Sequence, residues 1–235
     1  PWRIFTVNPA FELSEYQRRL TKVRTAMSDK ELDALVIGDP ANMNWLTGFD
    51  AWSFYVPQVM LVLHDHPPVW LGRQMDAGSV ALTTHLGSES VRPYAEDLVQ
   101  RDGVHPMDAI GTSLAEVHLE GQRVGFESDT YFFSFKAVER LQAKLSGAIW
   151  VDADLLVNWC RAVKSDVEIE AMRGAARIAS HVMTLAVEHI APGVLQCDLV
   201  SKVLAAQVSG VDGLGGDTTA LCPLILAGAA AATAH

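Results

Sequence analysis

Short apolar segments alternate with helix-like segments along the first part of the chain, and this alternation constrains the fold more than any other feature. Residues 33–37 read Asp-Ala-Leu-Val-Ile and run into Gly-Asp-Pro, as buried strands commonly do. Strands that alternate with helices build layered α/β structures in which helices cover a sheet. We therefore expect residues 1–153 to form an α/β domain with a mixed sheet flanked by helices.

The first helix is expected over residues 14–29. Ser14 is a candidate N-cap because Gln17 follows three positions later, at capping-box spacing, and the apolar side chains of the segment share one face. The other expected elements of this domain are a hairpin of strands 58–64 and 69–72, helices 74–86, 106–118 and 131–145, and strands 89–93, 123–127 and 148–151.

A second domain is expected from residue 154. Ser165 and Glu168 have capping-box spacing, and the long helix that they open stops at the Ala-Pro-Gly of residues 191–193. A second helix over residues 196–209 and an apolar, strand-like segment from Ala220 should follow. Two helices and one strand cannot bury their apolar faces alone. We therefore expect residues 154–235 to be the incomplete opening part of an α+β domain.

Composition narrows the class of partner. The chain has 235 residues and a formal net charge of −10, and no run of Lys and Arg offsets that charge locally, so a nucleic-acid partner is not expected. The most apolar stretch, from Ala220 to Ala234, is shorter than the ~20 residues that cross a bilayer. Three widely spaced cysteines are typical of a reducing compartment and of buried thiols. We expect a cytoplasmic protein that binds neither membrane nor nucleic acid.

Residues 42–55 concentrate aromatic and amide side chains in a segment without a helical or strand period. Gly48 interrupts the segment, and the flanking Pro40 and Pro57 indicate a loop. Aromatic rings on a loop suit a small, flat, partly apolar ligand, because they offer faces for stacking. The alternative is that the loop plugs the core of the domain, and the residues alone leave both interpretations open.

The remaining patterns name no reaction. The eight histidines include no HExxH or other recognisable ligand spacing, and no serine lies in a GxSxG sequence. The glycines of residues 210–216 do not lie between a strand and a helix, so they are a weak candidate for phosphate binding. These patterns predict no metal site.

Several motifs resemble those of the creatinase/Xaa-Pro peptidase superfamily, whose catalytic domain has the pita-bread fold. The helix opening at residues 161–173 resembles the start of that domain, and the preceding α/β unit resembles the superfamily's N-terminal domain. Within the superfamily the chain is most similar to the ectoine hydrolase branch. The motifs that carry this resemblance are Asn42-Met43-Asn44-Trp45-Leu46-Thr47-Gly48, Asp50, Trp52-Ser53-Phe54-Tyr55, Trp70-Leu71-Gly72-Arg73, Met75-Asp76, His105-Pro106-Met107-Asp108, Val157-Asn158-Trp159-Cys160-Arg161 and Gly215-Gly216-Asp217.

The resemblance implies a hydrolase that adds water to the central carbon of a cyclic amidine, and so opens ectoine to N-acetyl-diaminobutyrate. Such a reaction needs proton transfer, and His235 matches the catalytic histidine of creatinase-like enzymes. Phe54 matches an aromatic residue of creatinase that packs on substrate and that is delivered by the neighbouring subunit of a homodimer, with Trp52 and Tyr55 beside it. The sequence leaves open whether this loop acts in its own subunit or across the dimer. The implied partners are a small-molecule substrate and a second copy of the chain.

Two positions depart from the family pattern. Val56 stands where creatinase carries an arginine that binds the substrate carboxylate, which disfavours creatine as substrate. The run from Ala227 to Ala230 is less polar than in ectoine hydrolases, so the choice between ectoine and hydroxyectoine stays open. The superfamily's metal ligands would follow His235, and creatinase-like branches work without metal, so the resemblance implies no cofactor.

Two other functions remain open from the sequence. One is a metal-dependent Xaa-Pro dipeptidase or aminopeptidase of the same superfamily. The other is a non-catalytic dimerisation or ligand-binding module on the same fold. The glutamates that would complete the family's site have no counterpart in these residues, so we expect residues 1–235 alone to be inactive.

Overall fold

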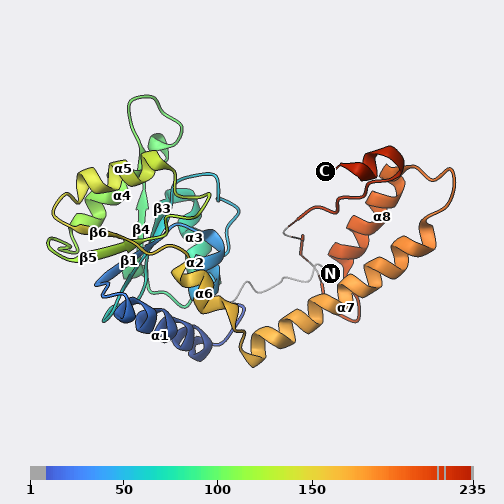
Figure 1. The fold of residues 1–235 in the computed structure, drawn as a ribbon, viewed down its shortest axis with the longest axis horizontal. Coiled ribbons are helices and arrows are strands. Elements are labelled where there is room, and N and C mark those ends of the chain that lie inside the picture. Colours follow the sequence, from blue (N-terminus) through green and yellow to red (C-terminus); the bar gives the residue numbers. More distant parts are fainter. Residues whose placement is uncertain (1–8, 216, 220, 234–235) are drawn as a thin grey trace. The chain divides into compact units, whose positions relative to one another are not determined.

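The computed structural model describes residues 9–215, 217–219 and 221–233, and it consists of two compact units that divide between Val163 and Lys164 (Figure 1). The sequence pattern placed the boundary earlier, at residue 153. The difference is helix α6 (Leu156–Ala162), which the pattern missed. Its residues Leu156, Val157 and Cys160 are buried in the same core as α1 (Leu13–Asp29), so α6 is part of the first unit.

A six-stranded mixed sheet forms the centre of the first unit, in the order β4-β3-β2-β1-β5-β6. Strand β1 pairs antiparallel with β2 and parallel with β5, and the remaining pairs are antiparallel for β2 with β3 and parallel for β3 with β4 and β5 with β6. The predicted α/β class with a mixed sheet is confirmed. The strands are β1 (Ala34–Ile37), β2 (Val59–Leu63), β3 (Val69–Arg73), β4 (Val91–Tyr94), β5 (Arg123–Phe126) and β6 (Ile149–Asp152).

Helices cover both faces of this sheet (Figure 1). Successive side chains of a strand point to opposite faces, and β1 shows this directly: Leu35 and Ile37 lie in the core with α1 and α6, whereas Ala34 and Val36 lie in the core of the other face. The helices on the first side are α1, α2 (Pro40–Thr47), α3 (Ala77–Thr83) and α6, and those on the second are α4 (Pro106–Ala115) and α5 (Phe135–Lys144).

Helix α2 corrects the expectation that the whole aromatic segment is a loop. Pro40 occupies the first helical turn, where a missing N–H costs nothing. The Asp39 carboxylate caps the helix by accepting from the Ala41 N–H at 2.7 Å. Gly48 ends it with φ of 87°, and a Cβ there would lie 2.6 Å from the Thr83 carbonyl oxygen. Pro40 and Gly48 therefore mark the start and the end of a helix rather than a loop.

The N-cap expected for α1 was wrong. The cap is Glu12, whose side chain makes no capping hydrogen bond, and the Glu15 N–H donates to the Glu12 carbonyl oxygen at 3.0 Å. Ser14 therefore lies inside the first turn, past the position where a hydroxyl can cap. The helical face itself is as predicted, with Tyr16, Val23 and Met27 buried.

The second unit contains α7 (Asp166–His189) and α8 (Gln196–Ser209). Ser165 and Glu168 form both hydrogen bonds of the capping box, so the predicted start of α7 is confirmed. A small core joins the two helices through Val182, Leu199 and Val203. The strand-like segment expected from Ala220 was wrong: residues 221–227 have no regular structure, and Gly228–Ala232 is a short 3₁₀ turn. This segment finds no neighbouring strand with which to pair among the described residues.

The cysteines depart in part from expectation. Cys160 is buried, as predicted, but Cys197 and Cys222 are exposed, because both lie in the second unit, whose small core covers little surface. Across the described residues, no helix is both long and apolar enough to cross a membrane.

Candidate functional site

Only some of the site residues proposed from the sequence lie in the part of the chain that the structure describes. Trp52, Phe54 and Tyr55 are described, whereas His235 lies outside the described residues and its role stays a prediction. Across the described residues, His, Cys, Asp and Glu side chains nowhere gather in groups of three that could hold a metal ion. The site is therefore built from the loop that joins α2 to β2.

That loop exposes three aromatic side chains, and we call residues 52–55 the aromatic loop. The exposed fractions are 73% for Trp52, 49% for Phe54 and 56% for Tyr55. The Phe54 ring centroid lies 5.9 Å from that of Trp52 and 5.8 Å from that of Tyr55, and both pairs meet edge to face. Trp45 and Phe49, from the same aromatic segment, are buried in the core. The two interpretations from the sequence, a core plug and an exposed aromatic surface, therefore each hold for one half of the segment.

A fourth aromatic side chain joins this surface from a distant part of the sequence. Phe132 lies in the loop between β5 and α5, and its ring centroid is 6.5 Å from that of Phe54, again edge to face. Sequence reasoning missed it, although the tandem Tyr131-Phe132-Phe133 was a signal of the same kind. Phe133 packs in the core, whereas Phe132 is partly exposed. The exposed aromatic surface therefore has contributions from two loops.

An ion pair lies beneath the aromatic loop. The Arg73 guanidinium, at the end of β3, donates from Nε to the Asp76 carboxylate at 3.2 Å, and both side chains are buried to about nine tenths. The Cζ atom of Arg73 is 5.7 Å from the ring centroid of Tyr55, which is cation–π range. The charged pair therefore lies against Tyr55 of the aromatic loop.

The far end of the same loop is fixed by Tyr94. Its hydroxyl donates to the Pro57 carbonyl oxygen at 2.7 Å. Burial raises the pKa of Tyr94 above its ordinary value, so the hydroxyl keeps its proton at neutral pH. Val56, at the position where the resemblance to creatinase implies an arginine, is buried. It offers no polar group to the aromatic surface.

A second polar cluster lies at the carboxyl ends of β1 and β5, centred on Glu127. The Glu127 carboxylate accepts from the backbone N–H groups of Gly38 at 3.0 Å and Asp39 at 3.1 Å, and from the side-chain amide of Asn42. Asn42 in turn donates to Asn158 Oδ1 at 2.8 Å and accepts from the Arg161 guanidinium at 2.6 Å. The cluster joins two strand ends to α2 and α6.

Burial controls the protonation of this cluster. Glu127 is 1% exposed, and desolvation raises its pKa from 4.5 to about 7, although the hydrogen bonds from Asp39, Asn42 and Gly38 act in the opposite direction. Sequence reasoning did not find Glu127, because a single carboxylate after a strand has no distinctive spacing. Perturbed carboxylates mark functional sites or structural networks. The Glu127 carboxylate is itself buried and bonded to main-chain and side-chain groups of the same unit, which indicates a structural network.

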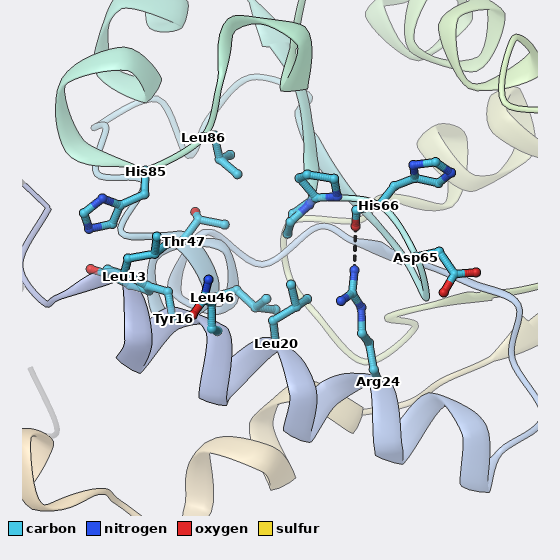
Figure 2. Close-up of a pocket in the computed structure, with 13 residues that line it drawn as sticks. Leu13, Tyr16, Leu20, Arg24, Leu46, Thr47, Asp65, His66, His85 and Leu86 are labelled. Carbon is cyan, nitrogen blue, oxygen red and sulfur yellow. Dashed lines mark hydrogen bonds between the residues drawn. The ribbon is translucent and has the colours of Figure 1, made fainter.

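The structure also contains a pocket of about 360 Å³ beside α1, shown in Figure 2. Leu20 and Leu46 form part of its apolar wall, and the Arg24 guanidinium at its edge donates to the His66 carbonyl oxygen at 2.6 Å. None of the residues of the aromatic loop lines it. We place the candidate site at the aromatic loop, because its exposed rings are held by buried polar contacts. At the pocket, by contrast, the Arg24 guanidinium is already bonded to the main chain of the turn at His66.

A comparison with known proteins identifies one protein family and relatives that are similar over most of this chain. Residues 19–163 match the creatinase/prolidase N-terminal domain family. An ectoine hydrolase of Halomonas elongata is 41% identical over 97% of this chain and 59% of its own length. An uncharacterized hydrolase/peptidase of Sinorhizobium fredii is 40% identical over 88% of this chain and 53% of its own length. The chain therefore spans little more than half the length of these relatives.

A solved structure shares the fold at low sequence identity. Recombinant prolidase from Thermococcus sibiricus aligns with a TM-score of 0.69 at 16% identity, and the alignment covers 88% of this chain and 52% of the prolidase. At that identity the likeness concerns the fold.

Glu127→Gln should remove the part of the pH dependence of the unfolding free energy that comes from the Glu127 carboxyl group. The folded-state pKa of about 7 exceeds the ordinary value of 4.5, so the folded chain holds this proton more tightly than the unfolded chain. The resulting stabilisation is complete below about pH 4.5 and is lost as the pH rises through about 7. Each pKa unit corresponds to about 1.4 kcal/mol, so the unfolding free energy of the wild type should fall by up to ~3 kcal/mol relative to the variant.

Urea unfolding at several pH values between 4 and 8 measures this difference. Glu120→Gln is the control for the loss of a carboxylate as such, because Glu120 is exposed. A difference between wild type and Glu127→Gln that stays constant across the range would show that Glu127 does not titrate there.

Proposed function

The chain belongs to the creatinase/prolidase N-terminal domain family, and from that premise we propose that it is part of a hydrolase that opens the ring of ectoine. The observation that carries the proposal is the 41% identity to an ectoine hydrolase over 97% of this chain, which includes both units. This chain covers 59% of the relative's length, so the proposed active enzyme is a chain of more than 235 residues.

The proposed reaction follows from the chemistry of a cyclic amidine. Its central carbon is bonded to two nitrogens and becomes electrophilic when the ring is protonated. Water adds to this carbon, and the bond to one ring nitrogen breaks as that nitrogen takes up a proton. A base must accept the proton from water and an acid must return it to the leaving nitrogen. We assign this transfer to His235, because imidazole has a pKa near neutrality.

The aromatic loop is the proposed wall of the substrate site. A flat heterocycle can stack on exposed rings, and Phe54 is the central ring of the surface, in contact with Trp52, Tyr55 and Phe132. Such a wall excludes water from one face of the substrate. The proposed assembly is a homodimer in which this loop serves the site of the neighbouring copy.

The proposed setting is cytoplasmic, with a small molecule as the partner and no nucleic acid. The net charge of −10 supports this, since nucleic-acid binding rests on basic surfaces. Usage of three cysteines without a CxxC pair is consistent with a reducing compartment.

Substrate assays of the full-length enzyme test the proposed reaction. We expect release of N-acetyl-diaminobutyrate from ectoine, with activity retained in the presence of a chelator. A Gly-Pro dipeptide is the matched comparison, because a metal-dependent dipeptidase is the alternative within the superfamily. Turnover of the dipeptide alone, abolished by the chelator, would exclude ectoine hydrolysis. Binding of ectoine without product would indicate a ligand-binding module instead.

Phe54→Ala should weaken catalysis with little effect on stability. The side chain is 49% exposed, so its truncation should change the unfolding free energy by less than ~1 kcal/mol, whereas a buried Phe costs about 3–5 kcal/mol. We expect kcat/KM for ectoine to fall about 10–100-fold, equivalent to about 1.4–2.7 kcal/mol of lost transition-state stabilisation. Ile149→Ala is the control, since Ile149 is 51% exposed on the edge strand β6. A large loss of melting temperature with unchanged kinetics would assign Phe54 to the core.

Mixing two impaired variants tests His235 and the homodimer together. One protein carries Phe54→Ala and the other His235→Ala, and the latter should lose about 10²–10⁴-fold in kcat. If the loop serves the neighbouring copy, each mixed dimer contains one intact site out of two, so it should have up to about half of the activity of a wild-type dimer. Near-normal kcat for His235→Ala would remove this residue from the mechanism, and no recovery on mixing would place loop and histidine in one copy.

A further inference from the structure

The aromatic loop has one residue that points inward. Ser53 is 4% exposed, although its neighbours Trp52 and Phe54 are 73% and 49% exposed. The contacts that hold Ser53 therefore help to set the conformation of the loop. Apolar burial cannot hold it, because the side chain is a single hydroxymethyl group, so the polar contacts of Ser53 must do so.

Those contacts lead to Arg73. Its Nη2 atom donates to Ser53 Oγ at 2.7 Å, and Ser53 Oγ donates to Asp76 Oδ1 at 2.7 Å. The Asp76 carboxylate also accepts from Arg73 Nε at 3.2 Å, which closes a ring of three buried side chains. Charge-assisted hydrogen bonds are stronger than neutral ones, and this ring contains two groups of opposite charge around one hydroxyl.

Two further contacts connect this hydrogen-bonded group of Ser53, Arg73 and Asp76 to the exposed surface and to the core. The Arg73 guanidinium carbon lies 5.7 Å from the ring centroid of Tyr55, so Arg73 contacts the loop at two points. The Ser53 carbonyl oxygen accepts from Gln58 Nε2 at 3.4 Å, and Gln58 Oε1 accepts from Trp70 Nε1 at 3.3 Å. Both Gln58 and Trp70 are buried, so the main chain at Ser53 is tied to the sheet.

We infer that Arg73 is the positioning residue of the aromatic loop: held by Asp76, its guanidinium fixes Ser53 and lies under Tyr55, so that Trp52, Phe54 and Tyr55 form a ligand wall before ligand binds. The inference rests on the proposed function for the identity of the ligand. Arg73 does not touch substrate in this assignment, because it is buried beneath the rings. It acts through Ser53 and Tyr55.

The shape of the guanidinium explains why this position needs arginine. One planar fork supplies Nε to Asp76 and Nη2 to Ser53, and its face is available to Tyr55. A lysine ammonium is a point charge without a face for stacking, so it can pair with Asp76 but cannot make all three contacts. Arg73→Lys therefore keeps the charge and removes the positioning geometry.

Two variants with a control test the inference. Arg73→Lys retains the buried charge, and Ser53→Ala removes only the bridging hydroxyl and leaves the ion pair, so it keeps the test open if Arg73→Lys fails to fold. Arg92→Lys is the control, because Arg92 lies on the neighbouring strand β4 and contacts Ser113 and Glu116 away from the loop. Amide hydrogen exchange of residues 51–58 in the 235-residue chain is the first measurement.

We expect exchange of this segment to be at least about tenfold faster in Arg73→Lys and Ser53→Ala than in wild type and Arg92→Lys, with protection of β1 and β5 unchanged. In the full-length enzyme, KM for ectoine should rise about tenfold or more while kcat changes less than about threefold. Unchanged loop exchange, or a fall in kcat at constant KM, would overturn the inference.

The two measurements separate the failure of this inference from the failure of the proposed function. Loop exchange is measured without substrate, so it tests the role of Arg73 whatever the enzyme hydrolyses. If the wild-type enzyme does not turn over ectoine while loop exchange responds as expected, the proposed function is wrong and Arg73 remains the residue that orders the loop.

Discussion

The buried carboxylate of Glu127 is the constraint on which the arrangement of the first unit depends. An ionisable group that is 1% exposed is costly unless donors surround it. Those donors come from the turn after β1 and from Asn42 on α2, and Asn42 is bonded in turn to Asn158 and Arg161 of α6. The turn, the start of α2 and the docking of α6 therefore have to be correct together, because a displaced element would leave a buried polar group without its partner.

The same constraint extends to the aromatic surface. Asn42 fixes the first turn of α2, and α2 ends at Gly48, close to the Thr83 carbonyl oxygen. The chain then enters the loop that carries the exposed rings, whose other end is fixed by Tyr94 at Pro57. The surface that we propose as a substrate wall is thus held at both ends by contacts within the first unit. It needs no contact with the ligand to acquire its shape.

The sequence predicted the sheet well because buried strands are short apolar runs bounded by turn residues, and β1 and the β2–β3 hairpin follow that pattern. It missed α2 because this eight-residue helix is buried on several sides, so its apolar side chains show no stripe. The role of Glu127 could not be predicted, since its partner Asn42 is far away in the chain and only the tertiary fold brings them together. The sequence could not show which aromatic residues of the segment are buried and which are exposed, because this too depends on tertiary contacts.

The way in which the aromatic loop is ordered favours a binding role over poor packing. Rings left exposed by a weak core would lie on a mobile segment, whereas Ser53, Arg73 and Asp76 beneath these rings are buried and mutually hydrogen-bonded. A binding surface that is already ordered loses less conformational entropy when ligand arrives, and so retains more of the contact free energy as affinity. Buried polar contacts suit this purpose because they fix the main chain and leave the aromatic faces free for a ligand. The exposure of the rings and the burial of their supports are therefore two parts of one arrangement.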